Sequence, residues 1–175
     1  MIELNDNIKG KILDIGGGGE GVISSIYGEN VVAIDYRKEE LDEVSYPCEK
    51  LVMDASNMSF SDESFPNVTS FYSFMFVAKS KHIEVINEIY RVLNKGGSFY
   101  LWDTNIAKET NKDNPFIVDL NIKAHNKIIQ TTFGIIKPNA IQNSTYFQKL
   151  CIESGFKLEK EIIDNQHFFQ HWIKV

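Results

Sequence analysis

Short apolar runs recur along the chain, separated by segments in which apolar residues return at helical spacing. Each run is rich in β-branched or aromatic residues and is short enough for a buried strand. The runs predict five strands, over residues 11–15, 31–35, 51–53, 68–74 and 98–102. Because strands that alternate with helices form a parallel sheet covered on both faces, the pattern predicts an α/β fold.

The clearest helix is predicted over residues 81–93, whose polar residues occupy the opposite face from an apolar stripe. The stripe contains Ile83, Ile86, Ile89, Tyr90 and Leu93. A left-handed turn at Gly96-Gly97 is predicted to end this helix and lead into the fifth strand. A structural turn accounts for both glycines, so neither is assigned any chemistry.

The C-terminal part of the chain predicts one more helix and a hairpin. The helix spans residues 144–154 and has a capping residue, Asn143 or Ser144, at its start. Two apolar runs follow, over residues 156–163 and 167–175, and a short polar turn separates them. These runs predict two antiparallel strands.

Length and composition predict one domain over residues 1–175, because the chain can bury a single sizeable core. Only residues 104–142 lack an assigned element. About ten residues precede the first strand, too few for a helical lid. We therefore expect 104–142 to be a substrate-covering insertion over the crevice, with Asn111, Asn114 and Gly134 as hinges. The alternative is a static extension of the sheet edge.

The charge balance disfavours some partners. The net charge is -6 and no lysine or arginine cluster occurs, which disfavours nucleic acid. No apolar run is long enough to cross a membrane and no signal peptide is evident, so we expect a cytoplasmic protein. Cys48 and Cys151 lack metal-ligand spacing, and His167 and His171 share a strand face without a third ligand. We expect no metal.

Residues 12–21 place an acid, Asp14, at the end of an apolar strand, directly before a glycine-rich turn and a helix. Backbone amides in such a turn can hold a nucleotide-like cofactor. Gly16, Gly18 and Gly21 satisfy the dinucleotide spacing G-x-G-x-x-G. However, Asp14 would repel a pyrophosphate and attract the cationic amino group of an amino-acid moiety. This favours S-adenosylmethionine over NAD.

The run Asp14-Ile15-Gly16-Gly17-Gly18 resembles the first motif of class I S-adenosylmethionine-dependent methyltransferases, although Glu20 stands where a glycine is common. The run from Arg91 to Gly97 resembles that family's signature before the fifth strand, with Lys95 in place of proline. The resemblance implies a three-layer, doubly wound Rossmann-like fold. Its mostly parallel seven-stranded sheet has the order 3-2-1-4-5-7-6, with the last strand antiparallel.

Further cofactor contacts follow from the resemblance and from the strand ends. Asp35 closes the second strand, where a carboxylate can accept both ribose hydroxyls, and Tyr36 follows it in the site. Asp54-Ala55 resembles the motif that reads the adenine edge, and Gly17 and Tyr72 complete the cofactor-binding set. The alternatives are that Asp35 caps the segment 37–43 and that Asp54 caps the next turn.

The segment from Phe71 to Phe76 lies where the family places the acceptor. Tyr72 and Ser73 are candidates to orient it, and His82, at the start of the following helix, is a weaker catalytic candidate than a helix cap. His125 is a further histidine within reach of a substrate. The Asn/Asp-Pro-Pro-aromatic motif of enzymes that methylate nucleic-acid amines is absent, so the acceptor is expected not to be a nucleobase amine.

Together these features predict S-adenosylmethionine-dependent methyl transfer to an unidentified small-molecule acceptor. Methyl transfer from a sulfonium is an in-line displacement that alignment and desolvation can accelerate without a dedicated base. Two alternatives remain open. One is an NAD-dependent oxidoreductase, and the other is a non-catalytic S-adenosylmethionine-binding partner subunit. The expected protein is a monomer or homodimer, or needs a partner protein to complete the acceptor site.

Overall fold

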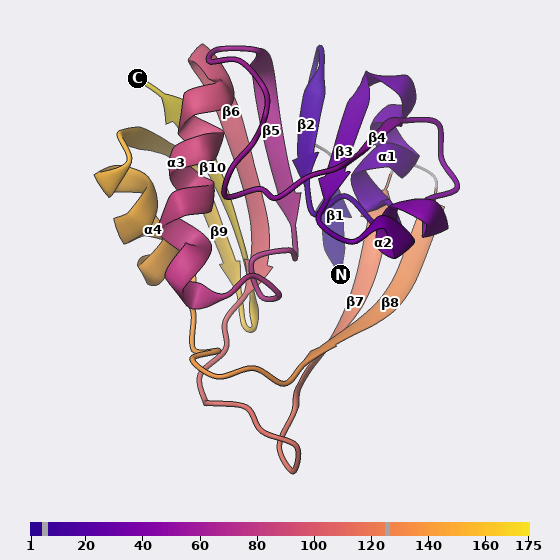
Figure 1. Cartoon of the computed structure of the whole chain (residues 1–175). Helices are drawn as coiled ribbons and strands as arrows, with labels where there is room; N and C mark the ends of the chain where they lie inside the picture. Colours follow the sequence, from indigo (N-terminus) through magenta and orange to yellow (C-terminus); the bar gives the residue numbers. More distant parts are fainter. Residues whose placement is uncertain (5–6, 125–126) are drawn as a thin grey trace.

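The computed structural model describes residues 1–4, 7–124 and 127–175. Its main sheet has seven strands (Figure 1), in an order that matches the predicted 3-2-1-4-5-7-6. Strand β10 is antiparallel to both of its neighbours, and the other strands run parallel to one another, again as predicted. In spatial order the strands are β4 (Glu49–Val52), β3 (Val31–Asp35), β2 (Ile12–Ile15), β5 (Phe65–Phe71), β6 (Leu93–Thr104), β10 (His167–Lys174) and β9 (Phe156–Asp164).

Helices cover one face of this sheet and part of the other. Helices α3 (His82–Val92) and α4 (Ser144–Glu153) lie on the same face (Figure 1), close to the predicted bounds of both. Their buried residues, such as Ile86 and Phe147, pack with Phe99 and Trp172 of the sheet. On the opposite face lie α1 (Val22–Tyr27) and α2 (Lys38–Glu43), and two short 3-10 helices, Gly28–Asn30 and Lys79–Lys81, join elements.

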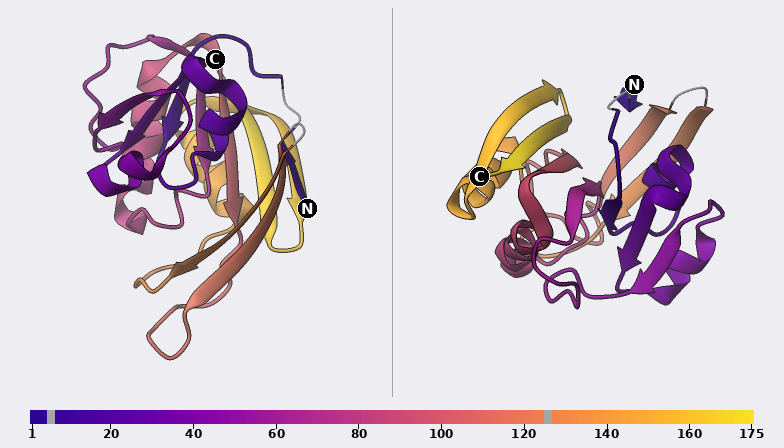
Figure 2. Two further views of the ribbon diagram at one scale, coloured as in Figure 1. Left: turned by 90° about the vertical axis from the view of Figure 1, so that its right-hand side faces the viewer. Right: turned by 90° about the horizontal axis from the view of Figure 1, so that it is seen from above.

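The insertion forms a second sheet, which the sequence analysis did not predict. Strands β7 (Phe116–Ala124) and β8 (Lys127–Ile135) form a hairpin, and the N-terminal strand β1 (Ile2–Leu4) pairs in parallel with β7. Figure 2 shows β1 beside this hairpin, on the side of the main sheet away from α3 and α4. The expected alternative of an extension of the main sheet edge is therefore wrong.

Apolar residues of the hairpin belong to the core that α1 and α2 also cover. Val118, Leu120 and Ile122 alternate along β7 and are almost fully buried, at 1%, 2% and 0% exposure. This alternation is typical of a strand with one face against a core. The second sheet thus covers the part of this core that the two short helices α1 and α2 do not cover.

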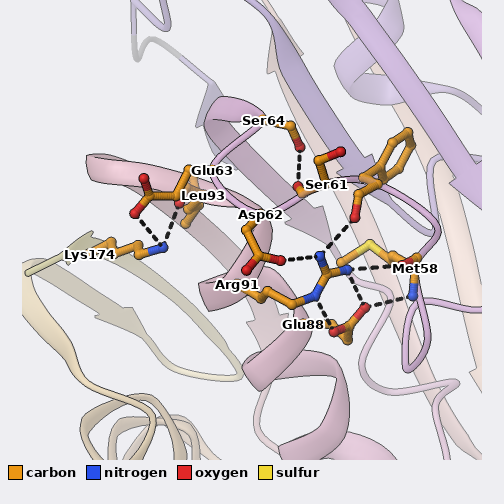
Figure 3. Close-up of polar contacts among 10 residues, drawn as sticks. Met58, Ser61, Asp62, Glu63, Ser64, Glu88, Arg91, Leu93 and Lys174 are labelled. Carbon is orange, nitrogen blue, oxygen red and sulfur yellow. Dashed lines mark hydrogen bonds and ion pairs between the residues drawn. The ribbon is translucent and has the colours of Figure 1, made fainter.

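Arg91 fixes the segment that follows the predicted adenine edge (Figure 3). Its guanidinium donates to the carbonyl oxygens of Met58 and Phe60, at 2.9 and 2.7 Å, and to the carboxylates of Asp62 and Glu88. Glu88 also accepts from the Met58 amide at 2.7 Å. These contacts hold the loop against α3, which gives a structural reason for the arginine of the family-like signature.

The glycines of the same signature do not end the helix, as the sequence predicted, because α3 already ends at Val92 and both glycines lie within β6. Gly96 has a φ of 74°, in the left-handed region, and a Cβ at Gly97 would lie 2.8 Å from the Asn94 carbonyl oxygen. Strand β6 begins at Leu93, before the two glycines, so it starts earlier than the predicted residue 98.

Candidate cofactor and acceptor site

The glycine-rich turn connects β2 to α1 along a path with almost no room for side chains. Gly16 has a φ of 66°, and a Cβ there would lie 2.5 Å from the Ser73 hydroxyl oxygen. A Cβ at Gly18 would lie 2.5 Å from the Cβ of Glu40. The Gly17 amide donates to the Ile34 carbonyl at 3.0 Å, which ties the turn to β3. Close packing of backbone therefore requires glycine here.

A cleft of about 670 Å³ opens beside this turn, at the carboxyl ends of β2, β3, β4 and β5. Ligand sites in open α/β sheets lie at this edge, and the volume is in the range of small-molecule sites. Every residue of the predicted cofactor-binding set lines the cleft: Asp14, Gly16, Gly17, Gly18, Asp35, Tyr36, Asp54, Ala55 and Tyr72.

Asp14 lines the floor of the cleft but is almost fully buried, at 2% exposure. Its Oδ1 accepts from the Thr69 hydroxyl at 2.7 Å. Burial raises the pKa of Asp14 to about 7, with the Thr69 hydrogen bond opposing the shift and the charge of Asp35 adding to it. A nearby cationic group would stabilise the ionised form, so this carboxylate suits an amino group better than an anion.

Asp35 and Asp54 both accept hydrogen bonds from backbone amides of the protein. Oδ1 of Asp35 accepts from the Arg37 amide at 2.9 Å, just before α2, and burial raises the pKa of Asp35. Oδ1 of Asp54 accepts from the amide and hydroxyl of Ser56, both at 2.8 Å, which lowers the pKa of Asp54. The Asp54 contacts are those of the predicted turn cap, whereas α2 has Arg37 as its N-cap and no side-chain cap, so Asp35 does not cap it. Both acids also line the cleft.

Near Asp54 the chain offers three apolar side chains that could contact an adenine ring, Met53, Met58 and Phe60. Met53 lines the cleft, whereas Met58 is core and Phe60 packs against that core.

The structure separates the three catalytic candidates. Ser73 lines the cleft, but its hydroxyl donates to the Ile15 carbonyl at 2.8 Å and so locks the turn to the loop after β5. Tyr72 lines the cleft with a buried side chain and a φ of 52°. A left-handed tyrosine is strained, and such strain concentrates at functional sites.

The sequence analysis named His82 as a weak catalytic candidate, but His82 does not line the cleft. Its side chain is 1% exposed, and Nε2 lies 3.1 Å from the carbonyl oxygens of both Phe74 and Val77. Nδ1 lies 3.2 Å from the Tyr146 hydroxyl. Burial lowers the pKa of His82 to about 4, so it is a neutral core histidine that supports the loop after β5.

Residues 104–142 make two contacts that were not predicted from the sequence, one in the cleft and one with the glycine-rich turn. Phe133 of β8 lines the cleft, with its ring centroid 5.9 Å from that of Phe76 and 6.3 Å from that of Tyr72. The Thr131 hydroxyl of β8 donates to the carboxylate of Glu20. Glu20 stands where the family commonly has a glycine. This difference was the sign in the sequence that the glycine-rich turn makes an additional contact, which the structure shows to be with Thr131.

Three further expectations concern His125, a metal site and a membrane-spanning segment. His125 lies outside the described residues. Within residues 1–4, 7–124 and 127–175, no three His, Cys, Asp or Glu side chains gather as metal ligands. The same part of the chain has no helix long and apolar enough to cross a bilayer.

Beside the loop after β5 lie two titratable groups that influence each other's charge, the buried Asp103 and the half-buried Lys137. Asp103 is fully buried, and its Oδ1 accepts from the Gln142 amide group at 2.7 Å, while its Oδ2 has no hydrogen-bond partner among the described residues. Burial raises the pKa of Asp103 to about 7. Lys137 donates to the Val77 carbonyl at 2.6 Å, and burial lowers its pKa to about 8.

The charge of Asp103 is expected to make stability depend on pH. The pKa of Asp103 is higher in the folded state than in the unfolded state, so between about pH 4 and about pH 7 the folded state binds more protons than the unfolded state. The contribution of Asp103 to the free energy of unfolding is therefore lost as the pH rises through this window. We expect Asp103→Asn to raise the free energy of unfolding by about 1–3 kcal/mol at about pH 8 and to change it little at about pH 5. Urea denaturation at both values tests this, with exposed Asp113→Asn as the control. An equal effect at both pH values would contradict it.

Comparison with known proteins gives one family match and many structural ones. Residues 13–101 match the methyltransferase domain family. A sterol 4-C-methyltransferase of Caenorhabditis elegans is 28% identical over 124 residues, which make up 65% of this chain and 36% of that protein. The matched region thus spans about a third of that relative's length.

Solved structures share the fold. A protein of Pyrococcus horikoshii has a TM-score of 0.70 at 20% identity, over 96% of this chain and 84% of its own. A glycopeptide N-methyltransferase solved with S-adenosylmethionine has a TM-score of 0.66 at 13% identity, over 98% of this chain and 90% of its own. At these identities the similarity concerns the α/β architecture.

Proposed function

Because the chain belongs to the methyltransferase domain family, we propose that it transfers a methyl group from S-adenosylmethionine (S-adenosyl-L-methionine) to a small-molecule acceptor. The observation that carries this proposal is the convergence of Asp14, Asp35 and Asp54 on one cleft beside the glycine-rich turn. S-adenosylmethionine is the cofactor of this domain, and the sterol-modifying relative acts on a small molecule.

The three acids suit three different parts of the cofactor. Asp14 binds the amino group of the cofactor. Because its carboxylate is buried, a neighbouring cation stabilises its ionised form more than it would at an exposed site. Asp35 accepts ribose hydroxyls through the carboxylate oxygen that Arg37 does not use. Asp54 accepts the adenine amino group, while the amide of Ala55 donates to a ring nitrogen. The bound cofactor supplies a methyl group activated by a positively charged sulfur.

The acceptor end of the cleft is apolar. Phe71, Phe76 and Phe133 line it, and an aromatic face can contact a sulfonium by cation-π attraction. Exclusion of water by these rings favours the displacement, since charge is dispersed as the methyl group transfers. Tyr72 and Ser73 bound the same end, and Ser73 acts through the turn that it fixes.

The first test is the choice of cofactor. We expect the purified protein to bind S-adenosylmethionine or its demethylated product at least roughly tenfold more tightly than NAD or NADP, because Asp14 disfavours a pyrophosphate. Isothermal titration calorimetry measures all four ligands. Equal or tighter binding of NAD would contradict the methyltransferase proposal and favour an oxidoreductase. Cofactor binding without formation of S-adenosylhomocysteine from any acceptor would favour a non-catalytic partner subunit.

Residues 104–142 are proposed to cover the substrate through β8. Strand β7 is anchored in the core, so movement is expected in the part of β8 that carries Thr131 and Phe133. The hydrogen bond from Thr131 to Glu20 links this part directly to the glycine-rich turn.

Hydrogen exchange tests the covering role. With bound S-adenosylhomocysteine, we expect slower exchange both at residues 16–21 and at residues 127–135, because cofactor contacts stabilise the turn and the strand together. Residues 116–124 serve as the internal control and should change little. Protection confined to the turn would show that the insertion is structural and that the acceptor site is open to a partner protein.

A further inference from the structure

Two aromatic rings from distant segments of the chain meet at the acceptor end of the cleft. Phe76 belongs to the loop after β5 and Phe133 belongs to β8, and both side chains line the cleft. Their ring centroids lie 5.9 Å apart and the ring planes are inclined by 79°, which is an edge-to-face contact. Rings in this contact leave no space for a further group between them, so the pair closes this end of the cleft.

The ring pair lies close to the place expected for the sulfur of the cofactor. The amide of Phe76 donates to the Ser73 carbonyl at 3.0 Å, and a Cβ at Gly16 would lie 2.5 Å from the Ser73 hydroxyl oxygen. The amino-acid part of S-adenosylmethionine, proposed to bind Asp14, carries the sulfur. The methyl group is therefore expected in the part of the cleft that Gly16, Ser73 and the ring pair surround.

In this arrangement of β8, Phe133 is held in place by its neighbours. Val118, opposite Phe133 on β7, is 1% exposed, so this face of the hairpin points into the core. The Tyr72 ring lies 6.3 Å from the Phe133 ring, and Tyr72 is itself 1% exposed, so Phe133 cannot retreat in that direction. Thr131, on the same face of β8, donates to Glu20 and holds the strand at the glycine-rich turn.

Phe76 differs from Phe133, because it is 51% exposed and can turn toward solvent. The space beside the sulfur therefore depends on Phe133. We propose that Phe133 is a specificity-determining residue, whose ring excludes alkyl groups much larger than methyl from the sulfur and so restricts the group that is transferred. The inference rests on the proposed function.

A larger alkyl group has two ways to fit, and each disrupts contacts of the closed cleft. It can push against the Phe133 ring, which Val118 and Tyr72 back, and overpacking of this kind weakens binding. Alternatively, β8 can move away from the cleft, which breaks the hydrogen bond between Thr131 and Glu20. Methyl requires neither change, so the cleft is expected to select the methyl-bearing cofactor.

Binding of a cofactor analogue tests this role without an acceptor. The probe is S-adenosylmethionine with an isobutyl group in place of the methyl group, and isothermal titration calorimetry measures both ligands. We expect the parent to bind the isobutyl analogue roughly tenfold or more weakly than S-adenosylmethionine. In Phe133→Ala the difference should shrink to roughly threefold or less, because the ring that meets the isobutyl group is removed. The ratio of the two affinities cancels any general loss of cofactor binding in the variant.

Phe116→Ala is the matched control. Phe116 is half-buried in the same hairpin and packs against the same core as Phe133, but it does not line the cleft. Its removal should leave the affinity ratio like that of the parent. Phe133→Leu is a milder second variant that keeps an apolar side chain, and its affinity ratio should lie between those of the parent and Phe133→Ala.

The outcomes separate this inference from the function on which it rests. A parent protein that binds neither S-adenosylmethionine nor S-adenosylhomocysteine refutes the proposed function and the inference with it. A parent that binds S-adenosylmethionine and the isobutyl analogue equally well refutes the size limit alone. An unchanged affinity ratio in Phe133→Ala, or an equal change in Phe116→Ala, overturns the role assigned to Phe133.

Discussion

Replacement of Asp35 by alanine is expected to weaken S-adenosylmethionine binding by about 2–4 kcal/mol, because two ribose hydroxyls lose a charged acceptor in a partly desolvated cleft. Asp35 ends β3 and lines the cleft beside Gly18. Its oxygen Oδ2 lies 3.1 Å from the position that a Gly18 Cβ would occupy, so the carboxylate reaches the turn itself. Calorimetry on the purified variant measures the loss directly.

Two further variants separate recognition from local structure. Asp35 also accepts from the Arg37 amide, and Asp35→Asn keeps an acceptor for that contact while it removes the charge. We expect Asp35→Asn to melt like the parent and still to bind more weakly. Asp54→Ala should cost about 1–2 kcal/mol of binding, since it removes one contact to adenine. Parent-like affinity in folded Asp35→Ala and Asp54→Ala would mean that the cofactor site is misplaced.

The central strands of the main sheet could be predicted because they are buried on both faces. Residues 31–35 form a strand with the predicted bounds, since Val31 to Ile34 are all at most 1% exposed. A continuous apolar run is the signature of such a strand. Helix α3 was equally clear, because its stripe faces the sheet and its polar side faces water.

The second sheet was harder to predict because its strands have mixed composition and a distant partner. Strand β1 is three residues long, and it pairs with β7, more than a hundred residues away. The alternation of Val118, Leu120 and Ile122 was available in the sequence, but only the fold shows which core it faces. Phe133 lines the cleft and Thr131 contacts Glu20 only because this sheet packs beside α1, so the sequence alone could not assign either residue to the site.

The residues that line the cleft could be predicted where the end of a strand fixes their position. They could not be predicted where packing decides the orientation of a side chain. Asp14 and Asp35 lie at the carboxyl ends of β2 and β3, and Asp54 follows β4. These ends meet at one edge of the sheet, so all three acids line the cleft. His82 begins the helix nearest that edge, yet its ring turns inward to the Phe74 and Val77 carbonyls. Topology places a backbone, whereas packing and hydrogen bonding decide which way an imidazole points.

The largest expected effect on stability comes from Phe147 of α4, whose side chain is completely buried. Its ring centroid lies 5.1 Å from that of Phe74, 5.5 Å from that of His82 and 5.7 Å from that of Phe168. Phe147 thus joins α4 to both the last strand and the loop after β5. Phe147→Ala is expected to lower the free energy of unfolding by about 3–5 kcal/mol, because it leaves a cavity among rings that cannot collapse together.

The control is Tyr146→Phe, which removes one hydroxyl near His82 and should cost only about 1 kcal/mol. Urea denaturation measures both variants, and a loss below about 1 kcal/mol for Phe147→Ala would contradict the packing role assigned to this ring. Because Phe74 belongs to the loop that carries Tyr72, the cavity should also loosen that loop. We expect faster hydrogen exchange at residues 72–78 in Phe147→Ala and a smaller change at residues 16–21. The glycine-rich turn keeps the backbone hydrogen bonds of Gly17 to Ile34 and of Gly19 to Glu40 even if its contact with Ser73 loosens.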